Sequence, residues 1–242
     1  MVKHVISAES VVKDYGSVCA LSGVSIDVGP GEIFGFLGPN GAGKTTMINI
    51  LTGQIKATSG LAMVLGIDCA KDAVRVRANV GIVPEQENPP SFLTAIEYLY
   101  FVAKIRKIKG YESKCSRWFE LLEFWDQKDV LCKDLSRGTR QKLMIAQAFL
   151  HEPKVVFIDE PLINLDPIMQ KKIKVYLKEY AEKGNTIFLS THVLEIADEL
   201  CERIAIIDKG KVVACDKLSD LKGKKDETLE NVFIRMIRGG DA

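Results

Sequence analysis

The chain has 242 residues, and 47% of them are hydrophobic, which is enough for a sizeable core in one large domain or in one domain with an inserted part. Its 33 basic residues nearly balance its 32 acidic ones, so the formal net charge is +1. This balance gives no support to a nucleic-acid or other polyanion partner, although it says nothing against a local basic patch.

The hydrophobic pattern argues against a membrane-spanning or secreted protein. The N-terminal segment lacks the long apolar core of a signal peptide, and no apolar run approaches the roughly 18 residues of a spanning helix. The six cysteines are scattered without any Cys-x-x-Cys pair, which predicts reduced thiols and argues against disulfide and metal roles. We therefore expect a cytoplasmic protein.

Two short antiparallel strands are predicted to open the chain. Strand-like runs lie within residues 3–13 and 23–28, and a glycine-proline-glycine turn at 29–31 follows the second. Tyr15 lies between the two runs. Its ring is a candidate for stacking on a purine base, although such a residue is more often simply packed in a turn.

The most informative stretch is GPNGAGKTT at residues 38–46, between an apolar strand-like run at 33–37 and a helix-like run at 47–51. Two glycines separated by four residues and followed by Lys and Thr form the pattern of a phosphate-binding loop. The glycines let backbone N–H groups and the positive end of the next helix face one anion. Lys44 would reach the β- and γ-phosphates, and the Thr45 hydroxyl would join the ligand shell of Mg²⁺. The predicted phosphate-binding residues are Gly38, Pro39, Asn40, Gly41, Ala42, Gly43, Lys44, Thr45 and Thr46.

The hydrophobic pattern changes between residues 84 and 135, and this change predicts an inserted helical part. Strand-like runs at 61–65 and 80–83 precede it, and stretches near 94–108 and 112–125 then show helical spacing with many aromatic residues. We expect most of these aromatic side chains to form local core, and an exposed remainder to form a docking surface.

Strands and helices alternate through the second half of the chain. The stretch LSRGT at 135–139 precedes a helical run to about residue 150, and apolar strands follow at 154–158, 186–190 and 204–207. Strands this apolar are typical of parallel sheets covered on both faces. The predicted fold class is therefore α/β, with a mainly parallel sheet. A charged linker at 223–227 leads to a short amphipathic segment at 229–237.

Three side chains at the ends of these strands are candidates for chemistry. Asp159 ends a strand and would lie near Thr45, where Mg²⁺ needs a carboxylate. Adjacent side chains on a strand point to opposite faces, so we predict a separate role for Glu160, as the general base that acts on water. His192 would hold the γ-phosphate or the water in line, because it follows a parallel strand at the edge where sites form.

Together these motifs resemble the nucleotide-binding subunit of an ATP-binding cassette (ABC) transporter over nearly the whole chain. GPNGAGKTT is similar to the Walker A motif, VVFIDEP at 155–161 to Walker B, LSRGT to the signature, NLDP at 164–167 to the D-loop and STH at 190–192 to the switch histidine. Tyr15 matches the aromatic residue that stacks on adenine. The run at 191–214 is most similar to the ABC-2 type, whose cassette and membrane domains are separate polypeptides.

The resemblance implies a P-loop NTPase core at about 1–84 and 136–222, with a small antiparallel β subdomain. A helical subdomain would occupy about 85–135, and a C-terminal tail about 223–242. It also implies ATP as substrate and Mg²⁺ as cofactor. The implied catalytic residues are Lys44, Glu160 and His192, and the implied metal ligands are Thr45 and Asp159. Either Glu85 or Gln86 fills the place of a family glutamine that contacts the nucleotide and the metal or its water.

The same resemblance implies two partners. Ser136 and Gly138 of one cassette would meet the phosphates held by a second cassette, so that a homodimer or heterodimer closes head to tail around two ATP molecules. A separate membrane-spanning permease subunit would dock near residues 92–102 and place the chain on the cytoplasmic face of the membrane. No nucleic-acid partner is expected.

Four residues depart from the family pattern: Arg137 and Thr139 in the signature, and Leu162 and Asn164 around the D-loop. If position 137 needs a positive φ, its non-glycine residue costs about 1–2 kcal/mol. If φ is negative, the guanidinium adds positive charge beside the partner's γ-phosphate, or it points into solvent without effect. The departures at 139 and 164 favour the interpretation that Arg137 impairs closure of the two-cassette site. On that interpretation, Arg137→Gly would raise ATPase activity.

Three alternatives predict different features. A soluble ABC ATPase that acts on ribosomes or nucleic acid would carry two cassettes or a long coiled coil, and neither pattern is present here. A kinase or GTPase would lack the signature stretch. A non-catalytic protein with this fold would not need Lys44, Asp159 and Glu160.

Overall fold

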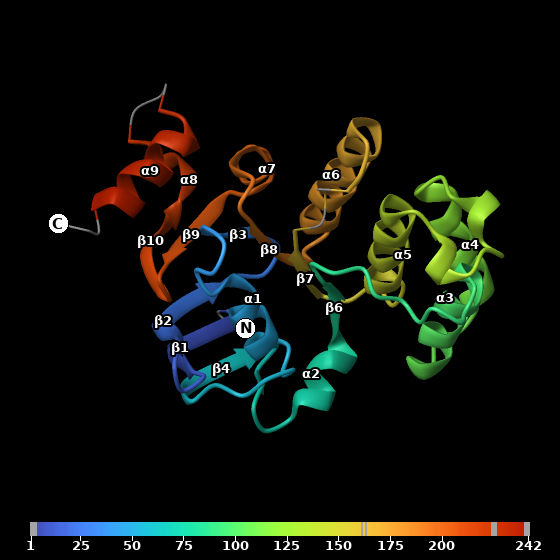
Figure 1. Ribbon diagram of the computed structural model, residues 1–242, viewed down its shortest axis with the longest axis horizontal. Helices are drawn as coiled ribbons and strands as arrows, with labels where there is room; N and C mark the ends of the chain where they lie inside the picture. The colour runs from blue at the N-terminus through green and yellow to red at the C-terminus, as the bar shows by residue number, and fades with distance from the viewer. Residues whose placement is uncertain (1–3, 161, 163, 224–226, 240–242) are drawn as a thin grey trace.

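The structure is a computed structural model, which describes residues 4–160, 162, 164–223 and 227–239. Pro161, the last residue of the Walker B stretch, and most of the expected linker at 223–227 lie outside the described residues. The described part combines a six-stranded sheet, a four-stranded antiparallel sheet and a group of helices at one end of the molecule (Figure 1).

The six-stranded sheet has the strand order β10-β9-β3-β8-β7-β6. Its strands are β3 (Ile33–Leu37), β6 (Val80–Val83), β7 (Val155–Asp159), β8 (Thr186–Thr191), β9 (Arg203–Asp208) and β10 (Lys211–Lys217). The pairs β9·β3, β3·β8, β8·β7 and β7·β6 are parallel, and β10 pairs antiparallel with β9. The prediction of a mainly parallel sheet is therefore confirmed.

The four-stranded sheet has the order β2-β1-β4-β5. It consists of β1 (Ile6–Asp14), β2 (Cys19–Val28), β4 (Ser59–Val64) and the short β5 (Ile67–Asp68). Strands β1 and β2 pair antiparallel, as expected for the opening of the chain. Along this pair, inward apolar residues such as Ile6, Ala8, Val24 and Ile26 are buried.

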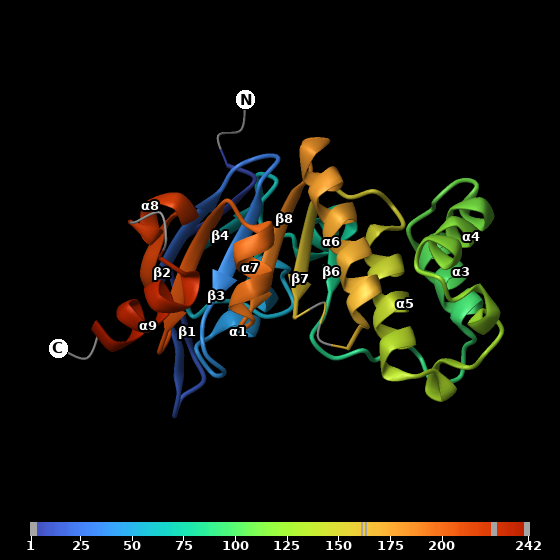
Figure 2. The same ribbon diagram turned by 90° about the horizontal axis from the view of Figure 1, so that it is seen from above.

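The central strands separate two layers of core because their side chains alternate. On β7, Val155 and Phe157 join the core beneath the antiparallel sheet, whereas Val156 and Ile158 join the core on the other face. Helix α1 (Lys44–Leu51) packs in the first layer. Helices α6 (Pro167–Glu182) and α7 (Leu194–Leu200) cover the second, as Figures 1 and 2 show. The full burial of these strands explains their largely apolar sequences.

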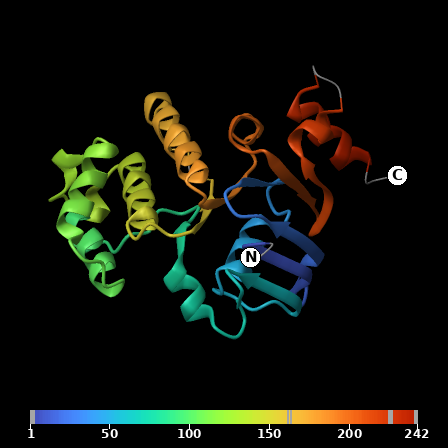
Figure 3. The ribbon, with the colours of Figure 1, turned by 180° about the vertical axis from the view of Figure 1, so that it is seen from behind.

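The helical part lies beyond β6 and is built from α3 (Ala95–Ile105), α4 (Tyr111–Leu121) and α5 (Arg137–Phe149), with single 3₁₀ turns at Trp125–Gln127 and Cys132–Asp134 (Figure 3). Helix α3 begins with a capping box, in which the Thr94 hydroxyl accepts from the Glu97 N–H and the Glu97 carboxylate accepts from the Thr94 N–H. Phe119 and Phe124 are buried in the local core, whereas Phe92 and Phe101 are exposed. The predicted helices are thus present.

The remaining helices are α2 (Ala73–Asn79), before β6, and α8 (Leu218–Lys222) and α9 (Leu229–Gly239) at the C-terminal end. Helix α9 corresponds to the amphipathic segment expected at 229–237, and it buries Leu229 and Val232. Among the residues that the structure describes, no helix is both long and apolar enough to cross a bilayer.

Candidate nucleotide site

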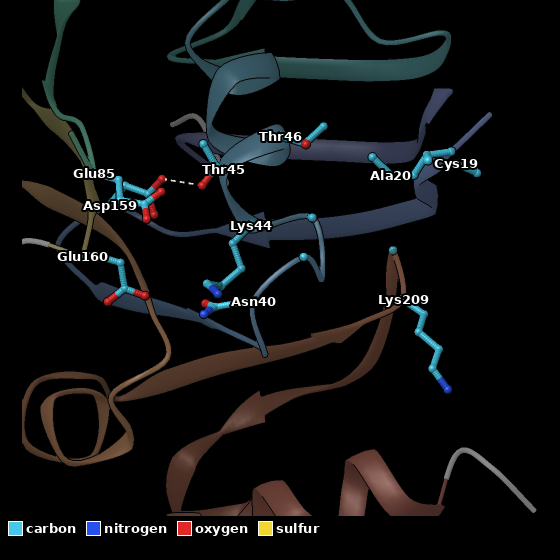
Figure 4. A pocket seen from close by; sticks show the side chains of 14 residues that line it. Cys19, Ala20, Asn40, Lys44, Thr45, Thr46, Glu85, Asp159, Glu160 and Lys209 are labelled. Atoms are coloured by element: carbon cyan, nitrogen blue, oxygen red, sulfur yellow. Dashed lines mark hydrogen bonds between the residues drawn. The ribbon is translucent and has the colours of Figure 1, made fainter. Parts of the chain in front are cut away.

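A cavity of about 470 Å³ lies at the carboxyl ends of β3 and β7. Its walls come from the loop before α1, from the segments that follow β6 and β7, from the start of β2 and from the turn between β9 and β10. Thr45, Glu85 and Asp159 lie together on one side, and Cys19 and Ala20 lie on the opposite side (Figure 4). Segments that are far apart in the sequence therefore meet at one edge of the parallel sheet.

The loop before α1 depends on two glycines. Gly43 has φ 109°, and a Cβ atom there would lie 2.6 Å from the carbonyl oxygen of Ala20. A Cβ on Gly38 would lie 2.4 Å from the carbonyl oxygen of Ile207. Both positions therefore require glycine, and α1 begins directly afterwards at Lys44, with its N-terminus at the cavity.

Lys44 is the buried cation of the site, with 7% of its surface exposed. Its Nζ donates hydrogen bonds to the carbonyl oxygens of Gly38 at 2.8 Å and Pro39 at 3.2 Å. Burial lowers the pKa of Lys44, and the charges of Glu160, Asp159 and Glu85 act in the opposite direction. An ammonium held at this point is suited to an anionic ligand.

Thr45 and Asp159 form the predicted metal-ligand pair. The Thr45 hydroxyl donates a hydrogen bond of 2.8 Å to Asp159 Oδ2, whereas Asp159 Oδ1 is buried and has no hydrogen-bond partner among the described residues. Burial raises the pKa of Asp159, the Ser190 and Thr45 hydroxyl groups act in the opposite direction, and the nearby charges of Glu85 and Glu160 raise the pKa further. A buried carboxylate oxygen without a partner, beside a hydroxyl, fits a hard cation.

The small number of protein oxygen ligands at this point fits Mg²⁺ in particular. No group of three or more His, Cys, Asp or Glu residues in the described part could hold a metal ion by itself. Magnesium is usually held by one or two protein ligands, and it takes its remaining ligands from phosphate and water. Thr45 and Asp159 are the residues that could hold such an ion together with phosphate and water.

Glu160 does not follow the strand geometry expected for it. Strand β7 ends at Asp159, and Glu160 has φ 50°, a conformation that non-glycine residues adopt at a cost of about 1–2 kcal/mol. Glu160 therefore lies outside the strand, and the expected alternation of side-chain faces does not apply to it. Hydrogen bonds, not the strand pleat, set the direction of this side chain.

Those hydrogen bonds come from the end of β8 and the residue after it. Glu160 Oε2 accepts from the Thr191 hydroxyl at 2.8 Å, and Oε1 accepts from the His192 N–H at 2.8 Å and contacts His192 Nδ1 at 2.6 Å. In the tautomer in which Nδ1 donates to this carboxylate, Nε2 is left for another contact. The structure thus brings the two predicted catalytic side chains together.

Glu85 and Gln86 were alternatives for one position, and they lie in different places. Glu85 lines the cavity and acts electrostatically on Lys44 and Asp159. Gln86 lines a separate hollow, together with Glu87, Asn88 and the start of α5. Glu85 is therefore the better candidate for contact with a metal-bound water.

Tyr15 does not line the cavity. Its side chain is exposed, and the Lys13 ammonium lies 4.8 Å from its ring centroid. Val18, Cys19 and Ala20, which sequence reasoning did not select, form the wall on this side. Lys209 and Gly210 were also missed, although their strand-ending Asp-Lys-Gly turn in the sequence is a usable signal.

The signature residues lie away from the cavity of their own chain. Ser136 caps α5, and its hydroxyl accepts a hydrogen bond from the Thr139 N–H at 3.1 Å. A Cβ on Gly138 would lie 2.8 Å from the carbonyl oxygen of Asn164. Arg137 is the first residue of α5 and is not among the residues with positive φ, so the backbone cost considered for this position does not arise.

Comparison with known proteins agrees with this arrangement. The model of the ABC transporter family matches residues 21–163, which is more than half of the chain. The probable multidrug ABC transporter ATP-binding protein YbhF of Escherichia coli is 33% identical over 98% of the chain. The chain spans only 42% of the length of YbhF.

Two further proteins extend the comparison. The daunorubicin resistance ATP-binding protein DrrA2 of Streptomyces coeruleorubidus is 34% identical over 90% of this chain and 69% of its own. The dimeric, post-hydrolysis structure of the ATP-binding cassette MJ0796 with ADP and Pi matches with a TM-score of 0.81 and 27% identity, covering 88% of this chain and 98% of that one. By its motifs, its fold and these relatives, the chain belongs to the ABC transporter family, as an ATP-binding cassette.

Proposed function

We propose that this chain is the ATP-binding and ATP-hydrolysing subunit of an ABC transporter and that it drives a separate membrane subunit. The observation that carries the proposal is the convergence of Lys44, the Thr45–Asp159 pair and Glu160 on one site at the carboxyl edge of the sheet, with His192 in contact with Glu160. These groups supply, in order, phosphate binding, metal binding and activation of water. The MJ0796 structure, which holds ADP and Pi, supports hydrolysis by a cassette of this fold.

Lys44 and the loop at residues 38–46 would bind the phosphates. The N-terminus of α1 lies at the cavity, and the loop residues Asn40, Gly41, Gly43, Lys44, Thr45 and Thr46 line it. Their backbone N–H groups and the helix N-terminus would favour negative charge there. Thr45 and Asp159 would hold Mg²⁺, and Glu85 would contact its water. When bound, the ion neutralises charge on the phosphate oxygens.

Glu160 would accept the proton of the attacking water. Thr191 and the His192 backbone fix its carboxylate in one direction, so the base does not have to be ordered during the reaction. His192 Nδ1 contacts the same carboxylate, which orients the imidazole ring and leaves Nε2 for the γ-phosphate.

A second cassette would complete each site. Ser136 and the N-terminus of α5 lie outside the cavity of their own chain, and in this arrangement they would meet a nucleotide that another protomer holds. In the closed dimer, the phosphate charge would help to hold the two cassettes together, because two helix N-termini would face the same ATP. The dimeric state of the MJ0796 cassette supports this arrangement.

The membrane subunit would dock on the helical part. Phe92, Phe101 and Ile105 are 77%, 50% and 63% exposed, and they form the apolar remainder that the local core does not bury. The docked chain would lie on the cytoplasmic face of the membrane. The name of DrrA2, a drug-resistance protein, supports export as the process that is driven.

The proposal predicts Mg²⁺-dependent ATP hydrolysis by the purified chain. Chelation with excess EDTA should abolish phosphate release, and added Mg²⁺ should restore it, because Thr45 and Asp159 hold the ion only together with the triphosphate. Phosphate release measured by a coupled assay checks this. Turnover that persists in EDTA would contradict the assigned metal pair, and the copurification of an integral membrane protein tests the partner.

A further inference from the structure

Glu87 is a buried carboxylate that the nucleotide site does not use. It lies in the segment after β6, its side chain is 6% exposed, and it lines the hollow that contains Gln86 and not the nucleotide cavity. A buried charge of this kind is costly unless it is paired and hydrogen-bonded. The contacts of Glu87 therefore indicate why it is there.

Glu87 has two partners, and both stand at positions that depart from the family pattern. Its Oε2 lies 3.5 Å from Arg137 Nε, and its Oε1 accepts a hydrogen bond from Asn164 Nδ2. Arg137 is the first residue of α5, next to Ser136, and Asn164 lies in the loop between β7 and α6. One carboxylate thus joins three separate segments.

Close packing at the same point restricts movement of the start of α5 relative to the loop that contains Asn164. A Cβ on Gly138 would lie 2.8 Å from the Asn164 carbonyl oxygen, so the start of α5 lies directly against the loop that Glu87 holds. Lys133 and Arg140 line the same hollow, but the Arg140 guanidinium donates to the Leu135 carbonyl oxygen at 3.1 Å. Arg137 is the cation that forms an ion pair with Glu87 in the described part of the chain.

We propose that Glu87 is a positioning residue of the two-cassette site: through Asn164, and with Arg137 as the compensating charge, it fixes Ser136 and the N-terminus of α5 in the direction that meets the partner's ATP. This inference rests on the proposed function. It reverses the expectation that Arg137 impairs closure, because Arg137 is the compensating charge for Glu87. Removing Arg137 alone leaves a buried carboxylate unpaired, whereas removing the Glu87 charge as well removes that cost.

The test compares ATP-driven dimerisation of variants that hydrolyse slowly. All variants carry Glu160→Gln, and light scattering over a dilution series with Mg-ATP gives the concentration of half-maximal dimerisation. Arg137→Gly should raise this concentration about tenfold, the size typical of coupled contacts. Glu87→Gln should raise it little, since the amide still bonds Asn164, and Arg137→Gly with Glu87→Gln should behave like Glu87→Gln alone.

Three controls separate positioning from other effects. Lys133→Ala removes a positive charge from the same hollow without touching Glu87 and should change nothing. Arg137→Lys keeps the charge and should retain most dimerisation. The affinity of the diluted monomer for a fluorescent ATP analogue should be unchanged in every variant, which a general loss of structure would not allow.

Each possible outcome either supports or overturns the role of Glu87. An Arg137→Gly variant that dimerises as well as its parent, or a double variant no better than Arg137→Gly, would overturn the role of Glu87. If Arg137→Gly does not yield folded protein and Glu87→Gln restores it, the pairing is supported, and failure of that rescue contradicts it. If the Glu160→Gln parent itself stays monomeric with Mg-ATP, the proposed two-cassette function fails first, which is a distinguishable outcome.

Discussion

Glu160→Gln is expected to lower the turnover of ATP by about 10²- to 10⁴-fold, the usual contribution of a general base, while Mg-ATP still binds. The amide has nearly the shape of the carboxylate, so the contacts to Thr191 and His192 can be retained in altered form. It cannot accept the proton of water. Steady-state phosphate release, together with a nucleotide-binding titration, measures the two effects separately.

The matched control for this variant is Glu195→Gln. Glu195 lies exposed in the first turn of α7, close to His192 in the sequence, and the same chemical change there should leave turnover as it is. The Glu160→Gln protein should also accumulate as an ATP-bound dimer in size-exclusion chromatography. Undiminished turnover of Glu160→Gln would remove this residue from the role of base.

Lys44→Ala is expected to raise the Kd for Mg-ATP by at least about 30-fold, equivalent to about 2 kcal/mol for the loss of a buried charged partner. The substitution removes the cation held by the Gly38 and Pro39 carbonyl groups and leaves the nearby carboxylates facing the triphosphate alone. Titration with a fluorescent ATP analogue measures the change.

Lys178→Ala serves as the control for Lys44→Ala, because Lys178 lies exposed on α6 and outside the nucleotide cavity. Its affinity for the analogue should equal that of the unmodified chain. If Lys44→Ala bound Mg-ATP with unchanged affinity, phosphate binding would have to be assigned to the loop backbone alone.

The phosphate loop and the central strands could be predicted from sequence because their signals are local. Gly38, Gly43 and Lys44 stand in one contiguous pattern, and each buried strand of the parallel sheet contains a short apolar run. The pairing of Thr45 with Asp159 followed from the rule that parallel strands bring their carboxyl ends to one edge.

The parts that sequence did not determine depend on where loops pack. Val18 to Ala20, which no motif singles out, form one wall of the cavity, because the fold of a loop decides which of its side chains face inwards. The choice between Glu85 and Gln86 likewise required the course of the segment after β6. Periodicity could not give the φ of Glu160, since that residue lies just past its strand.

The Glu87 network was missed for the same reason. Glu87, Arg137 and Asn164 come from three separate segments, and each is an ordinary polar residue in its own stretch. Arg137 and Asn164 were noticed only as departures from a pattern. Both residues contact the Glu87 carboxylate because folding brings the start of α5 and the loop after β7 together.

If each hydrolytic site needs a second cassette, specific ATPase activity must depend on protein concentration, and a dilution series measures this dependence. Activity per mole of chain should rise with protein concentration and reach a plateau as dimers form, because Ser136 lies outside the cavity of its own chain. Light scattering at the same concentrations reports the oligomeric state. Constant specific activity over a wide dilution range, with only monomers in solution, would contradict the account.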